Sequence, residues 1–188
     1  MPSVFMTMRS GNHKMAGYLR NNLGQGLLTS PFKAPLKAWA LVPVLAIVSV
    51  SVGFEAGLLK VGWLDSKIAP VLPLILFVFP SLLEEAFFRG ILIPRDILES
   101  GVHAAARAIG TSTVAFVVWH PVNALAFNPT AISLFLDPWF LVIVCALGAT
   151  CGYSYVISRS IWVPVIIHWV TVMVWVLFLG GRNLALEF

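Results

Sequence analysis

The chain has 188 residues, of which 59% are hydrophobic and only 11% are charged, and its mean hydropathy is +0.92. These shares exclude an ordinary water-soluble domain and indicate an integral membrane protein. The net charge of +4 comes without a cluster of Lys and Arg interleaved with aromatic residues, which argues against nucleic acid as a partner. Long uncharged stretches predict an all-α, polytopic membrane helix bundle, whose first partner is the lipid bilayer itself.

Residues 1–37 are predicted to form a cytoplasmic or interfacial arm, and residues 38–188 the transmembrane bundle. The first twenty residues lack the continuous apolar stretch that follows the basic residues of a signal peptide. Residues 21–35 contain Gly and Pro breakers, so we expect a linker between the arm and the bundle.

Five membrane-spanning helices are predicted in the bundle, each from a nearly uncharged stretch. They cover about residues 39–59, 68–93, 104–120, 139–157 and 161–180. Between the third and fourth helices, residues 121–138 mix polar and apolar side chains and predict a connector, as an interfacial loop or a short in-plane helix.

The Lys and Arg residues between these helices predict a cytoplasmic N-terminus, because cytoplasmic loops are enriched in them. Nine fall on the inner side in this orientation and three on the outer side. The inner set is Arg9, Lys14, Arg20, Lys33, Lys37, Arg89, Arg95, Arg107 and Arg159, and the outer set is Lys60, Lys67 and Arg182.

The second predicted helix carries three charged residues, Glu84, Glu85 and Arg89. An ionised group at membrane depth costs several kcal/mol, so it indicates a functional site with a partner nearby. Glu85 and Arg89 lie four residues apart on one helix face and can form an ion pair. Glu84 is turned about 100° away and stays free for chemistry. The alternative is that all three form one structural charge cluster at the inner end of the helix.

Two histidines, His120 and His168, are the candidate partners on other helices. At about 1.5 Å per residue from the inner helix ends, Glu84 lies roughly 16 Å deep, His120 roughly 20 Å and His168 roughly 12 Å. All three fall in the middle of a hydrocarbon core about 30 Å thick. Because scattered polar groups would be costly in lipid, we expect one interior cavity that also admits water.

These residue types suit hydrolysis of an amide by activated water. A carboxylate and an imidazole that share a water can remove its proton, a role for Glu84 and His120. His168 can donate to the oxyanion that forms on the carbonyl. A G-x-S-x-G motif is absent, and Cys145 and Cys151 match neither a redox pair nor a zinc motif, so we expect both to be packing residues.

Zinc is the chemical alternative, since two His and one or two Glu could also hold a metal-bound water. The H-E-x-x-H signature is absent, and Arg89 would place a cation close to the ion. The sequence therefore favours a site without metal or other cofactor.

At these residues the chain resembles the CAAX-protease and bacteriocin-processing family, the glutamic-type intramembrane proteases that include the Abi proteins. The resemblance rests on Glu84-Glu85-x-x-x-Arg89, then Phe116-x-x-x-His120, then Trp162-x-Pro164 leading into His168. It implies a polytopic α-helical endopeptidase in which Glu84 and His120 activate water, Glu85 and Arg89 shape the site, and His168 helps to hold the oxyanion. It also implies membrane-anchored or lipidated protein or peptide substrates. The short chain resembles a prokaryotic form, expected in the inner (cytoplasmic) membrane.

The chain departs from the family pattern at Val172, where Asn or Asp usually follows four residues after the histidine. Thr171 and Asn123 are the nearest substitutes by chemistry. Substrate-binding candidates are Phe88, Trp119, Asn123 and Trp169, although aromatic residues in a membrane bundle often serve as packing or interface anchors.

Two other function classes stay open. A non-catalytic membrane scaffold or immunity protein could keep the same fold, and Val172 favours it. A proton or ion pathway through Glu84 and the histidines is less favoured, because the chain lacks further polar residues to line a continuous route.

Overall fold

The computed structural model describes residues 15–181. Over this range the chain is helical and contains no strand, apart from a single bridge between Gly62 and Leu179. The predicted all-α bundle is confirmed. Arg9, Lys14 and Arg182, which entered the charge count, lie outside the described residues.

Helices occupy each of the five ranges in which the sequence predicted a span. The helices are η1 (Arg20–Gly24), α2 (Gln25–Leu28), η2 (Pro31–Lys33), η3 (Leu36–Trp39), α3 (Val42–Glu55), α4 (Leu72–Leu76), η4 (Phe77–Leu82), α5 (Leu83–Phe88), η5 (Ile97–Ser100), α6 (Val102–Ala126), η6 (Pro129–Ala131), α7 (Ile132–Phe135), α8 (Pro138–Ser158) and α9 (Trp162–Phe178). Among the described residues, three stretches are long and apolar enough to cross a membrane, namely Leu36–Glu55, Val102–Ala126 and Pro138–Ser158, and α9 is apolar but shorter.

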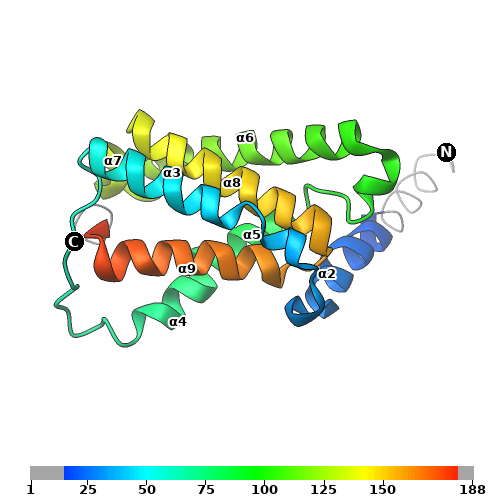
Figure 1. The fold of residues 1–188 in the computed structure, drawn as a ribbon, viewed down its shortest axis with the longest axis horizontal. Helices are drawn as coiled ribbons and strands as arrows, with labels where there is room; N and C mark the ends of the chain where they lie inside the picture. Colours follow the sequence, from blue (N-terminus) through cyan, green and yellow to red (C-terminus); the bar gives the residue numbers. More distant parts are fainter. Residues whose placement is uncertain (1–14, 182–188) are drawn as a thin grey trace, which may run out of the picture.

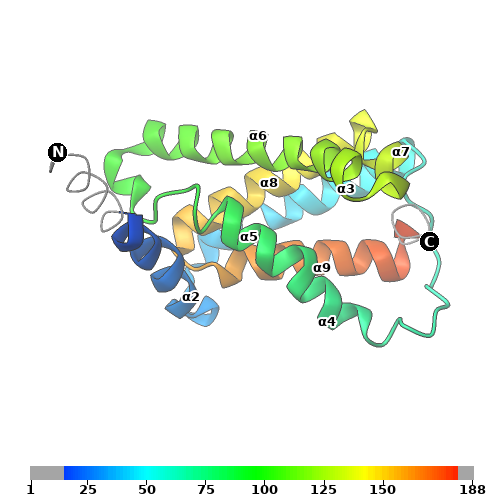
Figure 2. The same cartoon turned by 180° about the vertical axis from the view of Figure 1, so that it is seen from behind.

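Helix α8 is the centre of the bundle and packs against α3, α6 and α9 (Figures 1 and 2). It begins after Asp137, whose carboxylate accepts hydrogen bonds from the backbone N–H groups of Trp139 and Phe140. The absence of a side chain at Gly148 lets α6 approach closely, since a Cβ there would lie 3.1 Å from Thr113 Cγ2. Of the three long apolar stretches, α8 has the largest buried share.

The second predicted span is a broken helix rather than one continuous helix over 68–93. Helices α4, η4 and α5 follow one another, and Phe79 inside η4 has non-helical backbone angles (φ −121°, ψ 121°). Pro80 causes the break, because it lacks an N–H and disfavours helical geometry in the residue before it. The new helix that starts at Leu83 carries Glu84 and Glu85 in its first turn.

The third helix runs further than expected. The sequence predicted an end at about residue 120, whereas α6 continues through Pro121 to Ala126. Proline is tolerated inside membrane helices, where neighbouring groups can satisfy the freed backbone carbonyl. The connector therefore begins only at Phe127 and contains the short helices η6 and α7, as in the in-plane helix alternative.

The segment that we expected to be a linker is partly helical and hydrogen-bonded to the bundle. Residues 20–28 form η1 and α2, and the carbonyl of Gly26 accepts a hydrogen bond from the backbone N–H of Ile161 (3.1 Å). The Asn22 amide donates to the Ile93 carbonyl (3.2 Å). These bonds hold residues 20–28 against the end of the bundle where α9 begins.

Candidate active site

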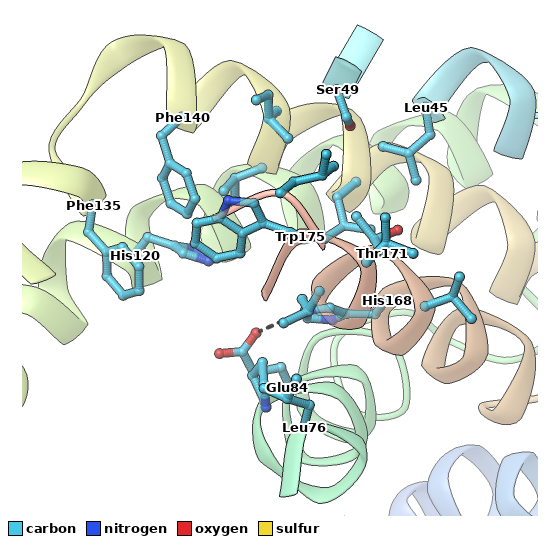
Figure 3. A pocket seen from close by; sticks show the side chains of 18 of the residues that line it. Leu45, Ser49, Leu76, Glu84, His120, Phe135, Phe140, His168, Thr171 and Trp175 are labelled. Atoms are coloured by element: carbon cyan, nitrogen blue, oxygen red, sulfur yellow. Dashed lines mark ion pairs between the residues drawn. The ribbon is translucent and has the colours of Figure 1, made fainter. Parts of the chain in front are cut away.

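A cavity of about 960 Å³ lies among α3, the α4–α5 segment, α6, α8 and α9. Glu84, His120 and His168 all line it, and in Figure 3 a dashed line joins the carboxylate of Glu84 to the imidazole of His168. Most other lining residues are apolar, among them Leu45, Leu76, Phe135, Phe140 and Trp175. The structure thus brings together the three titratable residues for which the sequence predicted one cavity.

Glu85 is the centre of a buried polar cluster beside this cavity. Its Oε1 accepts a hydrogen bond from Arg89 Nη1 (3.0 Å) and another from His168 Nδ1 (2.8 Å). Glu85 and Arg89 are fully buried, and His168 is 2% exposed. The predicted ion pair between Glu85 and Arg89 is present. The bond from His168 Nδ1 to Glu85 orients the imidazole so that Nε2 points away from Glu85.

Arg89 is held from three sides. Besides its ion pair with Glu85, its Nη2 donates to the carbonyl of Gly148 on α8 (3.0 Å). Its guanidinium carbon lies 4.6 Å from the centre of the Phe116 ring, a cation–π geometry. Arg89 therefore joins α5, α6 and α8 behind the site and does not face the cavity as a reactive group.

Glu84 has a different environment from its neighbour. Its Oε1 accepts a hydrogen bond from the indole Nε1 of Trp119 (3.1 Å), while its Oε2 lies 3.9 Å from His168 Nε2. Oε2 has no hydrogen-bond partner among residues 15–181. A gap of 3.9 Å is longer than a direct hydrogen bond, and a small polar molecule could bridge it.

His120 reaches the cavity from α6 with one nitrogen engaged. Its Nδ1 lies 2.9 Å from the backbone carbonyl of Phe116. Because a carbonyl only accepts, Nδ1 carries the hydrogen, and Nε2 of the neutral ring is an acceptor. The rings of Phe135 and Phe140 pack against the imidazole, with centroids 5.2 and 5.8 Å away. His120 is thus oriented to accept a proton at Nε2.

Three of the four predicted substrate-binding residues, Phe88, Trp119 and Asn123, line the cavity. Trp169 is not among the lining residues, and its indole N–H donates instead to the carbonyl of Pro73 (2.7 Å). Its ring packs edge-on against Phe77, with centroids 5.7 Å apart. The structure thus gives Trp169 a packing contact between α9 and the broken helix.

Val172 and Thr171 both line the cavity, so this wall has a methyl-bearing side chain where the family pattern has an amide or acid. The hydroxyl of Thr171 donates to the Ile167 carbonyl (2.8 Å), which engages its proton. The amide of Asn123, one turn beyond His120 on α6, is the other candidate donor on the cavity wall.

Ser49 is a polar lining residue that the sequence did not single out. It comes from α3, and its Oγ is buried without a hydrogen-bond partner within the described part of the chain (Figure 3). A serine in an apolar helix carries no signal of which neighbour it faces, and this helix lacks any of the three motifs. Phe135, Phe140 and Trp175 are further lining residues that the sequence did not single out.

Over residues 15–181, no group of three or more His, Cys, Asp and Glu is placed so as to hold a metal ion. His168 Nδ1 and Glu85 Oε1 are already bonded to each other.

A family model described as "Type II CAAX prenyl endopeptidase Rce1-like" matches residues 66–174. The match covers more than half of the chain and includes Glu84, Glu85, Arg89, His120 and His168. No curated protein and no solved structure is significantly similar to the chain.

Proposed function

Because the chain belongs to the Rce1-like family of type II CAAX prenyl endopeptidases, we propose that it is an intramembrane endopeptidase that uses a water activated by glutamate and histidine. The family is one of membrane-embedded proteases, and three described helices are apolar and long enough to cross a membrane. The observation that most supports the finer mechanism is the free Oε2 of Glu84, 3.9 Å from His168 Nε2 and in one cavity with His120.

In the proposed reaction a water donates one hydrogen bond to Glu84 Oε2 and the other to His120 Nε2. Glu84 takes one proton as the water oxygen bonds to the peptide carbonyl carbon, and the carbonyl oxygen becomes an oxyanion. The oxyanion then reforms the carbonyl, the C–N bond breaks, and the leaving amine takes the proton from Glu84. The products are a carboxylic acid and an amine, and the enzyme returns to its starting state.

His168 is the proposed donor to the oxyanion. Its Nδ1 is held by Glu85, which leaves Nε2 as the ring nitrogen on the side of Glu84. Arg89 balances the charge of Glu85 and acts on the site only through it. Asn123 is a second proposed donor, at the place where Val172 offers none.

The apolar lining supports substrates that are themselves membrane-anchored or lipidated. Cavities of this size usually bury most of an apolar ligand and orient it with a few polar groups. We place Phe88 and Asn123 among the substrate contacts. The proposed location is the inner membrane of a prokaryotic cell, as the family resemblance implies.

The decisive experiment compares protein N-termini in membranes from cells that make the wild-type chain, Glu84→Gln or Glu99→Gln at equal abundance. Glu84→Gln keeps the shape of the side chain but cannot take the proton, so we expect the new termini to vanish. Glu99 lies far from the cavity, in an exposed ion pair with Arg159, and its variant should retain them. Identical termini in all three membranes, where the protein is demonstrably needed, would contradict a protease.

We propose that the reaction needs no metal. The ion pair of Glu85 with Arg89 and its bond to His168 support this, since they occupy groups that a metal would need. Cleavage of a purified substrate that stops with a chelator and returns with Zn²⁺ would instead support the zinc-dependent variant.

The second candidate function is a non-catalytic membrane scaffold or immunity protein with the same fold. Val172 favours it, because the cavity wall lacks a polar side chain at that position. Binding or protection that survives Glu84→Gln would support the scaffold.

A further inference from the structure

We propose that Trp119 is a positioning residue whose indole N–H fixes the Glu84 carboxylate and leaves only Oε2 facing the attacking water. This inference rests on the proposed function, because it gives Trp119 a part in the same reaction. It differs from the sequence-based expectation that Trp119 contacts the substrate.

The contact that carries the inference joins two helices. Trp119 Nε1 on α6 donates to Glu84 Oε1 on α5 at 3.1 Å, across 35 residues of sequence. Among the described residues no other side chain or backbone group makes a hydrogen bond to this carboxylate, and Oε2 is buried without a partner. The indole therefore decides which oxygen is hydrogen-bonded and which is left without a partner.

Glu84 needs such a contact more than its neighbour does. Its side chain is 18% exposed and faces a largely apolar cavity, whereas that of Glu85 is fully buried between Arg89 and His168. A glutamate side chain has several rotatable bonds, and without a donor it would leave the orientation from which it can take the proton.

Trp119 is itself held in place. It sits within α6, one residue before His120, and its ring packs against that of Phe127 with centroids 6.1 Å apart. Trp119 and His120 are carried by the same segment of α6. The orientation of Glu84 therefore depends on the position of His120, the other residue that binds the water in the proposed reaction. Helix α5, which carries Glu84, and helix α6, which carries Trp119 and His120, thus position the water together.

The two roles for Trp119 predict different kinetics. A substrate contact made equally in the ground state and the transition state changes KM, whereas a group that orients the base changes kcat. Hydrogen bonds to charged groups contribute enough that losing this one should lower kcat about 10- to 100-fold.

The test uses the purified full chain and a peptide substrate identified from the N-terminus comparison. Trp119→Phe keeps an aromatic ring and removes the N–H, and we expect kcat to fall by that factor with KM within about twofold of the wild-type value. Trp162→Phe is the matched control, since its indole donates to the Leu27 carbonyl (2.7 Å) away from the cavity. Its kcat should not change.

Infrared difference spectra supply a measurement that needs no turnover. The carboxylate band assigned to Glu84 by comparison with Glu84→Gln should shift in Trp119→Phe and stay in place in Trp162→Phe. An unshifted band, an unchanged kcat, a raised KM at full kcat, or an equal loss of kcat in both Trp variants would overturn the inference. If Glu84→Gln is inactive while Trp119→Phe is normal, only this inference fails. If Glu84→Gln is fully active, the proposed function fails as well.

Discussion

Glu84 and Glu85 are adjacent in the sequence, yet their carboxylates have different surroundings. Glu85 is fully buried and bonded to Arg89 and His168, whereas Glu84 lines the cavity and has one oxygen without a hydrogen-bond partner among the described residues. The 100° turn between successive helical residues separates them. One carboxylate thus builds the site and the other is free to react in it.

Replacement of Glu85 by Gln should destabilise the fold. The variant leaves the buried guanidinium of Arg89 without a counter-ion, and breaking a buried pair in this way typically costs about 3 to 5 kcal/mol. Thermal unfolding in detergent micelles measures the loss. Glu99→Gln is the control, because the partly exposed pair with Arg159 contributes about 1 kcal/mol or less. A Glu85→Gln protein as stable as the control would contradict the structural role of the pair.

At this scale the sequence predicts contacts within one helix and misses contacts between helices. The spacing of Glu85 and Arg89 was enough to expect their ion pair, because residues four apart share a helix face. No spacing rule predicts that Trp119 donates to Glu84, since that contact depends on how α5 and α6 face each other. The same limit hid Ser49 on α3.

Among the helices, proline and glycine decide where the functional residues stand. Pro80 breaks the second span just before Glu84, while Pro121 leaves α6 continuous. Proline gives the same local signal in both places, so the sequence alone could not predict one break and one continuous helix. The surroundings of each proline, which follow from the packing of the bundle, decide the outcome.

Gly148 is a point of close packing between α8 and α6 behind the site, and Gly148→Ala should be destabilising. The added Cβ would lie 3.1 Å from Thr113 Cγ2 and 3.2 Å from Phe116 Cδ1, and Phe116 is fully buried and cannot easily move. Overpacking of this kind typically costs about 1 to 3 kcal/mol. We expect a lower unfolding temperature and, because the Gly148 carbonyl holds Arg89, lower activity.

Gly110→Ala is the matched control on the facing helix α6. Nothing lies within 4 Å of a Cβ at Gly110, so the change should be neutral or stabilising by up to about 1 kcal/mol, as expected from helix propensity. Equal unfolding temperatures for the two variants would show that α8 and α6 have room to separate at Gly148.

Across the whole molecule, the distribution of Lys and Arg predicts which end of the bundle faces the cytoplasm. Arg89, which the charge count placed on the inner side, is buried in the bundle and has no place in that count. Without Arg89, the described part of the chain still has six basic residues on the predicted inner side and two on the outer side. The inner set is Arg20, Lys33, Lys37, Arg95, Arg107 and Arg159, and the outer set is Lys60 and Lys67.

The remaining bias predicts that the end with residues 91–101 faces the cytoplasm. Single cysteines at Ser100 and Val61, both exposed and at opposite ends, can test this in a chain whose Cys145 and Cys151 are replaced by Ala. A membrane-impermeant maleimide should label Val61→Cys in intact cells or spheroplasts, and Ser100→Cys only after the membrane is opened. The opposite pattern would invert the orientation. Labelling must be scored only where a cytoplasmic marker protein stays unlabelled, because leaky cells would expose both ends. With the orientation known, the side of the membrane on which the new N-termini appear becomes a constraint on how substrate reaches Glu84.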